Sequence, residues 1–339
     1  MKKLKVNILY PLWATGKRGG GHGVETAFRE MVNGLSARDD VTVVINSWKP
    51  ADIIHDHSID PPSVLKLLLH RSKKNVVSGH LTRGSMVGSV SNWIVPFLFW
   101  YYKRIYRTAD AMVAVSATTR ENLISEMKIK VPIEVIENSI DTKVMATTDK
   151  QKAEFRQELG YKDRDFIIVS NGQVQPRKKF DEFVRVAKEL PDFKFIWVGG
   201  IPFKGVAADQ SELIKMINNP PKNLFVTNVI PLDMARKYMR MSDVYFHPAV
   251  QETFGIAIIE GAAAGLPVVL RDIPDYDHTF RPNAIMSDSA DFAKNLKKLA
   301  DDKKFYVKFR AEAFKMAKRY DNSTAAEKLV KFYRSILIQ

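Results

Sequence analysis

The chain has 339 residues, of which 45% are hydrophobic and 27% charged, with a formal net charge of +14 and no cysteine. This length fits two domains of ordinary size, and the absence of cysteine excludes disulfides, a thiolate zinc site and a cysteine nucleophile. The positive charge favours anionic partners, namely nucleic acid, anionic lipid or a phosphorylated substrate, although solvated surface lysines and arginines explain any single cluster as well.

Neither an export signal nor a membrane-spanning segment is expected. The basic start of the chain runs through a short apolar stretch into Pro11 and a glycine cluster, unlike a signal peptide. The most apolar window, residues 93–102, contains Pro96 and is shorter than the ~20 residues that cross a bilayer. The absence of cysteine favours a cytoplasmic protein as well.

Two series of short β-branched runs alternate with helical patterns. The first series comprises residues 4–10, 41–45, 53–55, 75–78, 111–115 and 133–136. The second comprises residues 166–170, 193–198, 224–226, 244–247, 267–270 and 284–286. This alternation predicts an α/β protein with two doubly wound, Rossmann-like parallel sheets.

A polar and charged stretch, residues 141–157, separates the two series and predicts the domain boundary. We expect one domain over residues 1–150 and a second over residues 151–320. Spaced apolar residues among lysines and arginines predict amphipathic helices near the C-terminus, and residues 321–339 are expected to pack back on the first domain.

The first predicted strand leads into a glycine-rich turn that includes Gly21 and Gly23, and a helical pattern follows. Glycines allow backbone N–H groups and a helix N-terminus to approach an anion closely. The turn is a candidate phosphate site. It matches neither the Walker pattern nor a dinucleotide fingerprint, so a flexible loop is the alternative interpretation.

Two cations, Arg177 and Lys178, follow the first strand of the second series. Ligands of open parallel sheets bind beyond the carboxyl ends of the strands, so these side chains are expected to face the crevice. They are well placed to bind a diphosphate. A solvated basic turn is the alternative.

The segment 251–269 is the most informative. Glu252 lies in a loop after the predicted strand 244–247, a helix rich in small residues begins near Phe254 and Gly255, and Glu260 lies two turns into it. Free N–H groups of the first helical turn can hold a phosphate, while both carboxylates can accept hydrogen bonds from sugar hydroxyls. This combination suits a nucleotide sugar; a buried, structural Glu260 is the alternative.

An aromatic and basic segment, residues 93–107, suits the headgroup region of an anionic membrane. Its candidate membrane or acceptor contacts are Trp93, Phe97, Trp100, Lys103, Arg104 and Arg107. The alternative is a core helix buried on all sides against the first sheet.

Together these residues resemble the retaining GT-B glycosyltransferases of family four, over nearly the whole chain. The resemblance implies that Glu260 binds the ribose, that Lys178 binds the diphosphate, and that Glu252 holds the transferred sugar and diphosphate together with the backbone of Phe254, Gly255 and Ile256. The family often has Arg where this chain has Gln173, which leaves Arg177 as the second cation. No cofactor and no metal is implied, although a His-x-His pair such as His55 and His57 can ligate zinc in other proteins.

A narrower resemblance is to bacterial hexosyltransferases that extend monoglucosyl-diacylglycerol to the dihexosyl anchor of lipoteichoic acid. It is carried by residues 172–178, by residues 78–80 with 85–89, and by residues 270–276. It implies transfer of a hexose, glucose or galactose, from a UDP-sugar to a glycolipid at the inner face of the cell membrane, with His80 at the reacting sugar. Either a same-face route or a covalent intermediate would retain the anomeric configuration.

Three other functions remain open on the sequence. A glycosyltransferase for a soluble or polyprenyl-linked glycan would keep every donor-site residue. A GT-B epimerase would alter the nucleotide sugar without an acceptor. A nucleic-acid-binding protein would explain the charge and lose affinity steeply with salt, but it leaves the donor residues unexplained, so no nucleic acid is expected as a partner.

Overall fold

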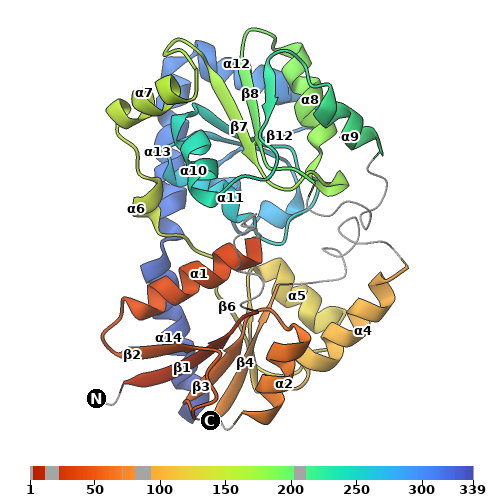
Figure 1. Cartoon of the computed structure of the whole chain (residues 1–339), viewed down its shortest axis with the longest axis vertical. Coiled ribbons are helices and arrows are strands. Elements are labelled where there is room, and N and C mark those ends of the chain that lie inside the picture. The colour runs from red at the N-terminus through yellow and green to blue at the C-terminus, as the bar shows by residue number, and fades with distance from the viewer. Residues whose placement is uncertain (1–2, 12–22, 71, 81–92, 202–210, 339) are drawn as a thin grey trace.

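The computed structural model describes residues 3–11, 23–70, 72–80, 93–201 and 211–338. Two parallel six-stranded sheets, each covered by helices on both faces, lie one above the other (Figure 1). The predicted fold class, with two doubly wound sheets, is confirmed. All twelve predicted strands are present, and no strand end differs from the prediction by more than one residue.

The first sheet has the strand order β2-β1-β3-β4-β5-β6. Its strands are β1 (Leu4–Leu9), β2 (Val41–Ile45), β3 (Ile53–Asp56), β4 (Lys74–Gly79), β5 (Ala111–Ala114) and β6 (Ile133–Val135). One face packs against α1 (Gly23–Ser36) and α14 (Asn322–Ile338). The other packs against α2 (Pro61–Leu69), α4 (Val95–Tyr106) and α5 (Ala117–Ser125). Strand β5 is buried on both faces, which explains its uninterrupted apolar run. Strand β3 is equally buried, although it ends in His55 and Asp56.

The second sheet has the order β12-β11-β10-β7-β8-β9. Its strands are β7 (Ile167–Asn171), β8 (Lys194–Val198), β9 (Leu224–Val226), β10 (Val244–His247), β11 (Val268–Arg271) and β12 (Ile285–Ser287). One core packs it against α10 (Leu232–Met241), α11 (Ile256–Ala263) and α13 (Lys303–Arg319). The other core packs it against α8 (Phe180–Glu189), α9 (Ser211–Asn218) and α12 (Phe292–Asp301).

The chain passes between the two sheets twice, and the two passages lie side by side. After β6 it continues into α6 (Thr142–Met145) and α7 (Asp149–Glu158), and after α13 it returns as α14. Ile140 N–H donates to the carbonyl of Tyr320 at 3.0 Å, and Asn322 N–H donates to the carbonyl of Ile140 at 2.9 Å. The C-terminal helix therefore belongs to the core of the first sheet, where Figure 1 shows it beside α1.

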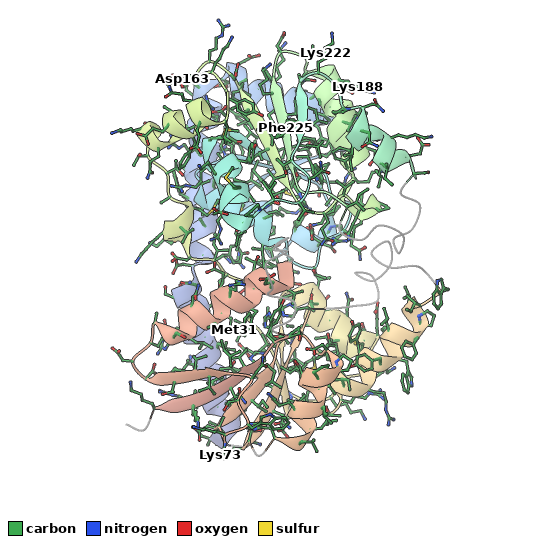
Figure 2. The ribbon with its side chains drawn as sticks, viewed as in Figure 1. Met31, Lys73, Asp163, Lys188, Lys222 and Phe225 are labelled. Carbon is green, nitrogen blue, oxygen red and sulfur yellow. The ribbon has the colours of Figure 1, made fainter. Side chains whose placement is uncertain are left out.

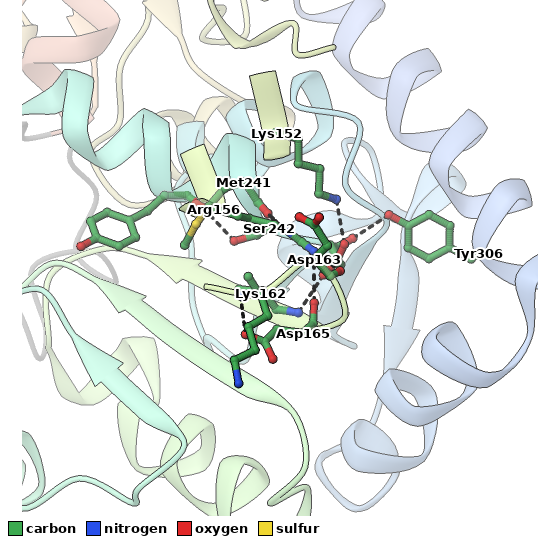
Figure 3. A network of polar contacts seen from close by, with 11 residues as sticks. Lys152, Arg156, Lys162, Asp163, Asp165, Met241, Ser242 and Tyr306 are labelled. Atoms are coloured by element: carbon green, nitrogen blue, oxygen red, sulfur yellow. Dashed lines mark hydrogen bonds and ion pairs between the residues drawn. The ribbon is translucent and has the colours of Figure 1, made fainter. Parts of the chain in front are cut away.

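A partly buried ionic network holds the amino ends of β7 and β10, opposite the edge where ligands bind in such sheets (Figure 3). Arg156 donates to the carbonyl of Met241 at 2.9 Å and to the Asp243 carboxylate at 2.7 Å. Lys152 pairs with the same carboxylate at 2.7 Å, and the Tyr306 hydroxyl donates to the Asp243 carbonyl at 3.1 Å. These charges are therefore structural.

Other cations are spread over the surface. Lys73 lies at the outer end of the first sheet, whereas Lys188 and Lys222 lie at the opposite end of the molecule (Figure 2). All three are exposed. These lysines lie far apart on the surface and do not belong to one basic patch.

Candidate active site

The carboxyl ends of β7 and β10 bring Lys178 and Glu252 together. The two strands are neighbours, and Lys178 ends a short 3₁₀ turn after β7 (Pro176–Lys178), while Glu252 lies in the loop after β10. The Lys178 ammonium group forms an ion pair with Glu252 Oε1, and Arg177 Nη1 lies 3.5 Å from Oε2. Both cations predicted to bind a diphosphate thus surround one carboxylate.

A glycine contact fixes the path of the chain into this turn. Gly199, at the end of β8, has φ of +132°, and a Cβ atom there would lie 2.2 Å from the carbonyl oxygen of Gly172. Trp197 Nε1 donates to the same carbonyl at 2.9 Å. Only glycine permits this approach, which positions the segment that leads to Lys178.

His247 is a member of the site that the sequence analysis did not single out. Its Nε2 lies 2.8 Å from Glu252 Oε1, and its side chain is buried at the last position of β10. The backbone N–H of Glu252 donates to Asp275 at 2.9 Å. The signal for His247 was its place at the carboxyl end of a predicted strand, at the same sheet edge as Glu252.

The charges of this cluster are strongly coupled. Burial acts to raise the pKa of Glu252, but Lys178, His247 and Arg177 outweigh it and hold that pKa well below its usual range. Burial lowers the pKa of Lys178 to about 8, despite the opposing effect of Glu252. At neutral pH Glu252 is therefore ionised and Lys178 is protonated. An incoming polyanion can compete with Glu252 for the lysine.

The helix that follows this loop begins at a left-handed glycine. Gly255 has φ of +95° and caps α11, and a Cβ atom there would lie 2.7 Å from Ile258. The side chain of Phe254 is buried against Phe280 and Tyr320, so this residue offers only its backbone to a ligand. Ile256 is the first helical residue, where N–H groups have no partner within the helix.

Glu260 is buried in α11 and bound by an arginine that the sequence analysis missed. Arg236 Nε lies 3.3 Å from Glu260, and Arg236 Nη2 lies 3.2 Å from Glu30 of α1. Burial raises the pKa of Glu260, and Arg236 opposes this shift. Glu260 is thus paired within the second half of the chain, by an arginine that also contacts Glu30 in the first half.

The carboxyl ends of β3 and β4 carry a cluster of histidines around a cavity. His55 Nε2 lies 2.8 Å from Ser78 Oγ, which lies 3.3 Å from His57 Nδ1. The ring centroids of His57 and His80 are 4.3 Å apart. The cavity is lined by all four of these residues and by α1 and α14 residues that include Met31, labelled in Figure 2.

The cluster is uncharged at neutral pH. Burial, reinforced by His80, lowers the pKa of His55 to about 3, and burial lowers that of His80 to about 4. Among the described residues, the Nε2 atoms of His57 and His80 have no hydrogen-bond partner. Across the same residues, no group of three His, Asp or Glu side chains is arranged to hold a metal ion. The cavity therefore presents neutral imidazoles to a ligand.

The predicted glycine-rich site is only partly visible. Gly21 lies outside the described residues, and Gly23 is exposed at the start of α1. The contribution of this turn to phosphate binding stays a prediction.

The aromatic helix α4 is not buried on all sides. Val95 and Tyr106 of this helix are buried, and Tyr106 packs in the core of the first sheet. Phe97 and Trp100 are 62% and 58% exposed, and Trp93, just before the helix, is 82% exposed. The interpretation as a fully buried core helix is therefore wrong.

The cations of this segment follow the exposed aromatics. Arg104 and Arg107 are exposed, and Lys103 is half-buried. No helix in the described part of the chain has the length and apolar character needed to cross a bilayer. Figure 1 shows α4 on the outer side of the first sheet, away from α11.

Comparison with known proteins places this site in a family. Residues 45–144 match the model of Glycosyltransferase Family 4, and residues 151–316 match that of Glycosyl transferases group 1. An alpha-galactosylglucosyldiacylglycerol synthase of Streptococcus pneumoniae is 31% identical over 284 residues, which cover 81% of this chain and 74% of the relative. A processive diacylglycerol alpha-glucosyltransferase of Acholeplasma laidlawii is 28% identical over 66% of this chain and 68% of the relative.

Solved structures show the same fold. Anabaena HepE in complex with UDP and glucose superposes with a TM-score of 0.77 at 15% identity, covering 98% of this chain and all of that one. Sucrose-phosphate synthase of Thermosynechococcus elongatus gives a TM-score of 0.78 at 14% identity, covering 99% of this chain and all of that one. With two doubly wound sheets and a carboxylate-bound cation pair at the carboxyl edge of the second, the chain belongs to the GT-B glycosyltransferases and is a hexosyltransferase.

Proposed function

We propose that this enzyme transfers a hexose from a UDP-sugar to monoglucosyl-diacylglycerol, with retention of the anomeric configuration, at the inner face of the cell membrane. The observation that carries the proposal is the ion pair between Lys178 and Glu252 beside the N-terminus of α11. A diphosphate suits this place, because two cations and a positive helix end converge there.

Each part of the nucleotide sugar has a binding partner in this arrangement. Lys178 and Arg177 exchange Glu252 for the diphosphate, and the first-turn N–H groups at Gly255 and Ile256 add hydrogen bonds. Once released from the cations, Glu252 accepts hydrogen bonds from hydroxyls of the transferred sugar. Glu260 accepts those of the ribose. These assignments require no cofactor and no metal.

The chemistry follows from where charge develops. The bond between the anomeric carbon and the diphosphate oxygen breaks, the acceptor hydroxyl oxygen bonds to that carbon, and its proton ends on the UDP product. Lys178 and Arg177 stabilise the negative charge that builds on the leaving diphosphate. Closure of the two halves brings His80 to the reacting sugar and excludes water, which would otherwise hydrolyse the donor.

The acceptor side is supported by α4. A helix that exposes Phe97 and Trp100, follows the exposed Trp93 and ends in basic residues suits the interface of an anionic membrane, where a glycolipid presents its sugar. The two curated relatives described above are named for diacylglycerol-linked products, which fits the same acceptor class.

The test is transfer of radiolabelled sugar from UDP-glucose or UDP-galactose to monoglucosyl-diacylglycerol in anionic micelles. We expect product with one donor, and none from Glu260→Ala. Glu212→Ala is the matched control, because Glu212 is an exposed carboxylate on α9 that pairs only with Lys215 in the described structure. UDP binding without lipid product from either donor would overturn the lipid acceptor and favour a soluble or polyprenyl-linked glycan. Change of the UDP-sugar without any acceptor would instead indicate an epimerase.

A further inference from the structure

A chain of buried polar side chains runs from the C-terminal helix to the cavity beside His80. The hydroxyl of Tyr333, on α14, lies 2.5 Å from His55 Nδ1. His55 Nε2 lies 2.8 Å from Ser78 Oγ, and Ser78 Oγ lies 3.3 Å from His57 Nδ1. All four side chains are buried, and α14 lies along the first sheet (Figure 1).

The direction of these hydrogen bonds follows from the tyrosine. Burial raises the pKa of Tyr333 well above its ordinary value, so its hydroxyl keeps its proton. Among the described residues this hydroxyl has His55 as its only hydrogen-bond partner, so it must donate to Nδ1. The reverse order would leave a buried O–H without an acceptor, which is unfavourable.

This first hydrogen bond determines where the protons of His55, Ser78 and His57 lie. Neutral His55 carries its proton on Nε2 and donates it to Ser78, whose hydroxyl donates to His57 Nδ1. Burial, His80 and His55 lower the pKa of His57, with the Val24 backbone opposing, so this ring is also neutral. Its single proton therefore lies on Nε2.

We propose that Tyr333 is a positioning residue: through His55 and Ser78 it holds His57 in the tautomer that presents Nε2–H to the cavity, where it donates to an oxygen of the acceptor sugar. This inference rests on the proposed glycolipid acceptor. Nε2 of His57 is buried and makes no hydrogen bond of ordinary geometry in the described structure, although the Val24 backbone favours a proton on this ring. The ring lines the cavity beside His80. A sugar hydroxyl oxygen is the neutral acceptor that such a donor needs.

The test is Tyr333→Phe, which removes one hydroxyl. Tautomers are measured on protein with ¹⁵N-labelled histidine, using long-range ¹H–¹⁵N spectra without substrate. We expect His57 to carry its proton on Nε2 in the native protein and to become a mixture of tautomers in the variant. KM for the acceptor should rise about tenfold, the loss expected for a weakened hydrogen bond, while KM for the UDP-sugar stays unchanged.

Two further variants separate positioning from stability. Ser78→Ala interrupts the same chain elsewhere and should reproduce the tautomer mixture. His57→Gln carries an N–H donor that needs no tautomer, so adding Tyr333→Phe to it should cost no further acceptor affinity. Tyr306→Phe is the matched control, because its hydroxyl donates to Asp243 in the second half and should affect neither readout.

Either of two results would overturn the inference. One is a native His57 that carries its proton on Nδ1. The other is a Tyr333→Phe protein that melts at a lower temperature with unchanged tautomers and an unchanged KM for the acceptor. Because the tautomer measurement needs no substrate, failure of the proposed acceptor is distinguishable from failure of this positioning role.

Discussion

Arg236 Nη2 lies 3.2 Å from Glu30 Oε1, and this ion pair joins α10 of the second half to α1 of the first. The same guanidinium group contacts Glu260 at 3.3 Å. Glu30 also accepts from the backbone N–H of Asp141 at 2.8 Å, where the chain passes between the sheets. The carboxylate assigned to the ribose is therefore connected to the interdomain passage through one arginine.

Replacing this arginine should weaken donor binding. In Arg236→Met the buried Glu260 loses the cation that opposes its raised pKa, so a larger fraction is protonated and accepts poorly from two ribose hydroxyls. We expect UDP affinity to fall about tenfold, measured by titration calorimetry. Arg281→Met is the control, because Arg281 pairs with Asp272 and Asp277 at the surface. Unchanged UDP affinity in Arg236→Met would leave Arg236 with a purely structural role.

Adjacent lysines allow a direct test of the diphosphate site. Lys178 is buried and paired with Glu252, whereas its neighbour Lys179 pairs with Asp181 near the surface. Lys178→Met removes a charge-assisted contact and should weaken UDP binding by roughly 10- to 100-fold, while Lys179→Met leaves it within about twofold. Equal losses in both variants, measured by the same calorimetric titration, would contradict a specific role for Lys178.

The sequence was sufficient for the contacts that sheet topology decides. Strand runs are visible because buried parallel strands are continuously apolar, and the carboxyl ends of adjacent strands placed Lys178 and Glu252 at one edge. By contrast, Arg236 lies 206 positions from Glu30, and Tyr333 lies 278 positions from His55. Such pairs depend on how two sheets and a returning helix pack together, and no periodicity or spacing in the sequence encodes that geometry.

The alkaline limb of the pH profile should belong to Lys178. Its pKa in the free enzyme is lowered to about 8, chiefly by burial, so the cation is present below this pH and is lost as pH rises through it. kcat/KM for the UDP-sugar reports free-enzyme ionisations and should fall above about pH 8. Lys178→Arg keeps its charge at every accessible pH, so the fall should disappear in that variant, even if its activity is lower. An identical alkaline fall in both proteins would assign the ionisation to another group.

Membrane binding should depend on the basic end of α4. Replacing Lys103, Arg104 and Arg107 with glutamine removes three charges near the proposed lipid surface, each worth about 1 kcal/mol. Partitioning onto anionic vesicles, measured by co-sedimentation, should therefore fall on the order of 100-fold, with little change on neutral vesicles.

The control for this triple variant must change the net charge equally. Glutamine at Lys188, Lys222 and Lys294 does so at exposed positions of the second half. If binding depends on the place of the charges, this control retains most of its affinity for anionic vesicles. If both triple variants lose affinity equally, net charge alone drives adsorption, and α4 is not the docking surface. Glycolipid transfer should then be equally reduced in the two variants, whereas local docking by α4 predicts that only the first is impaired.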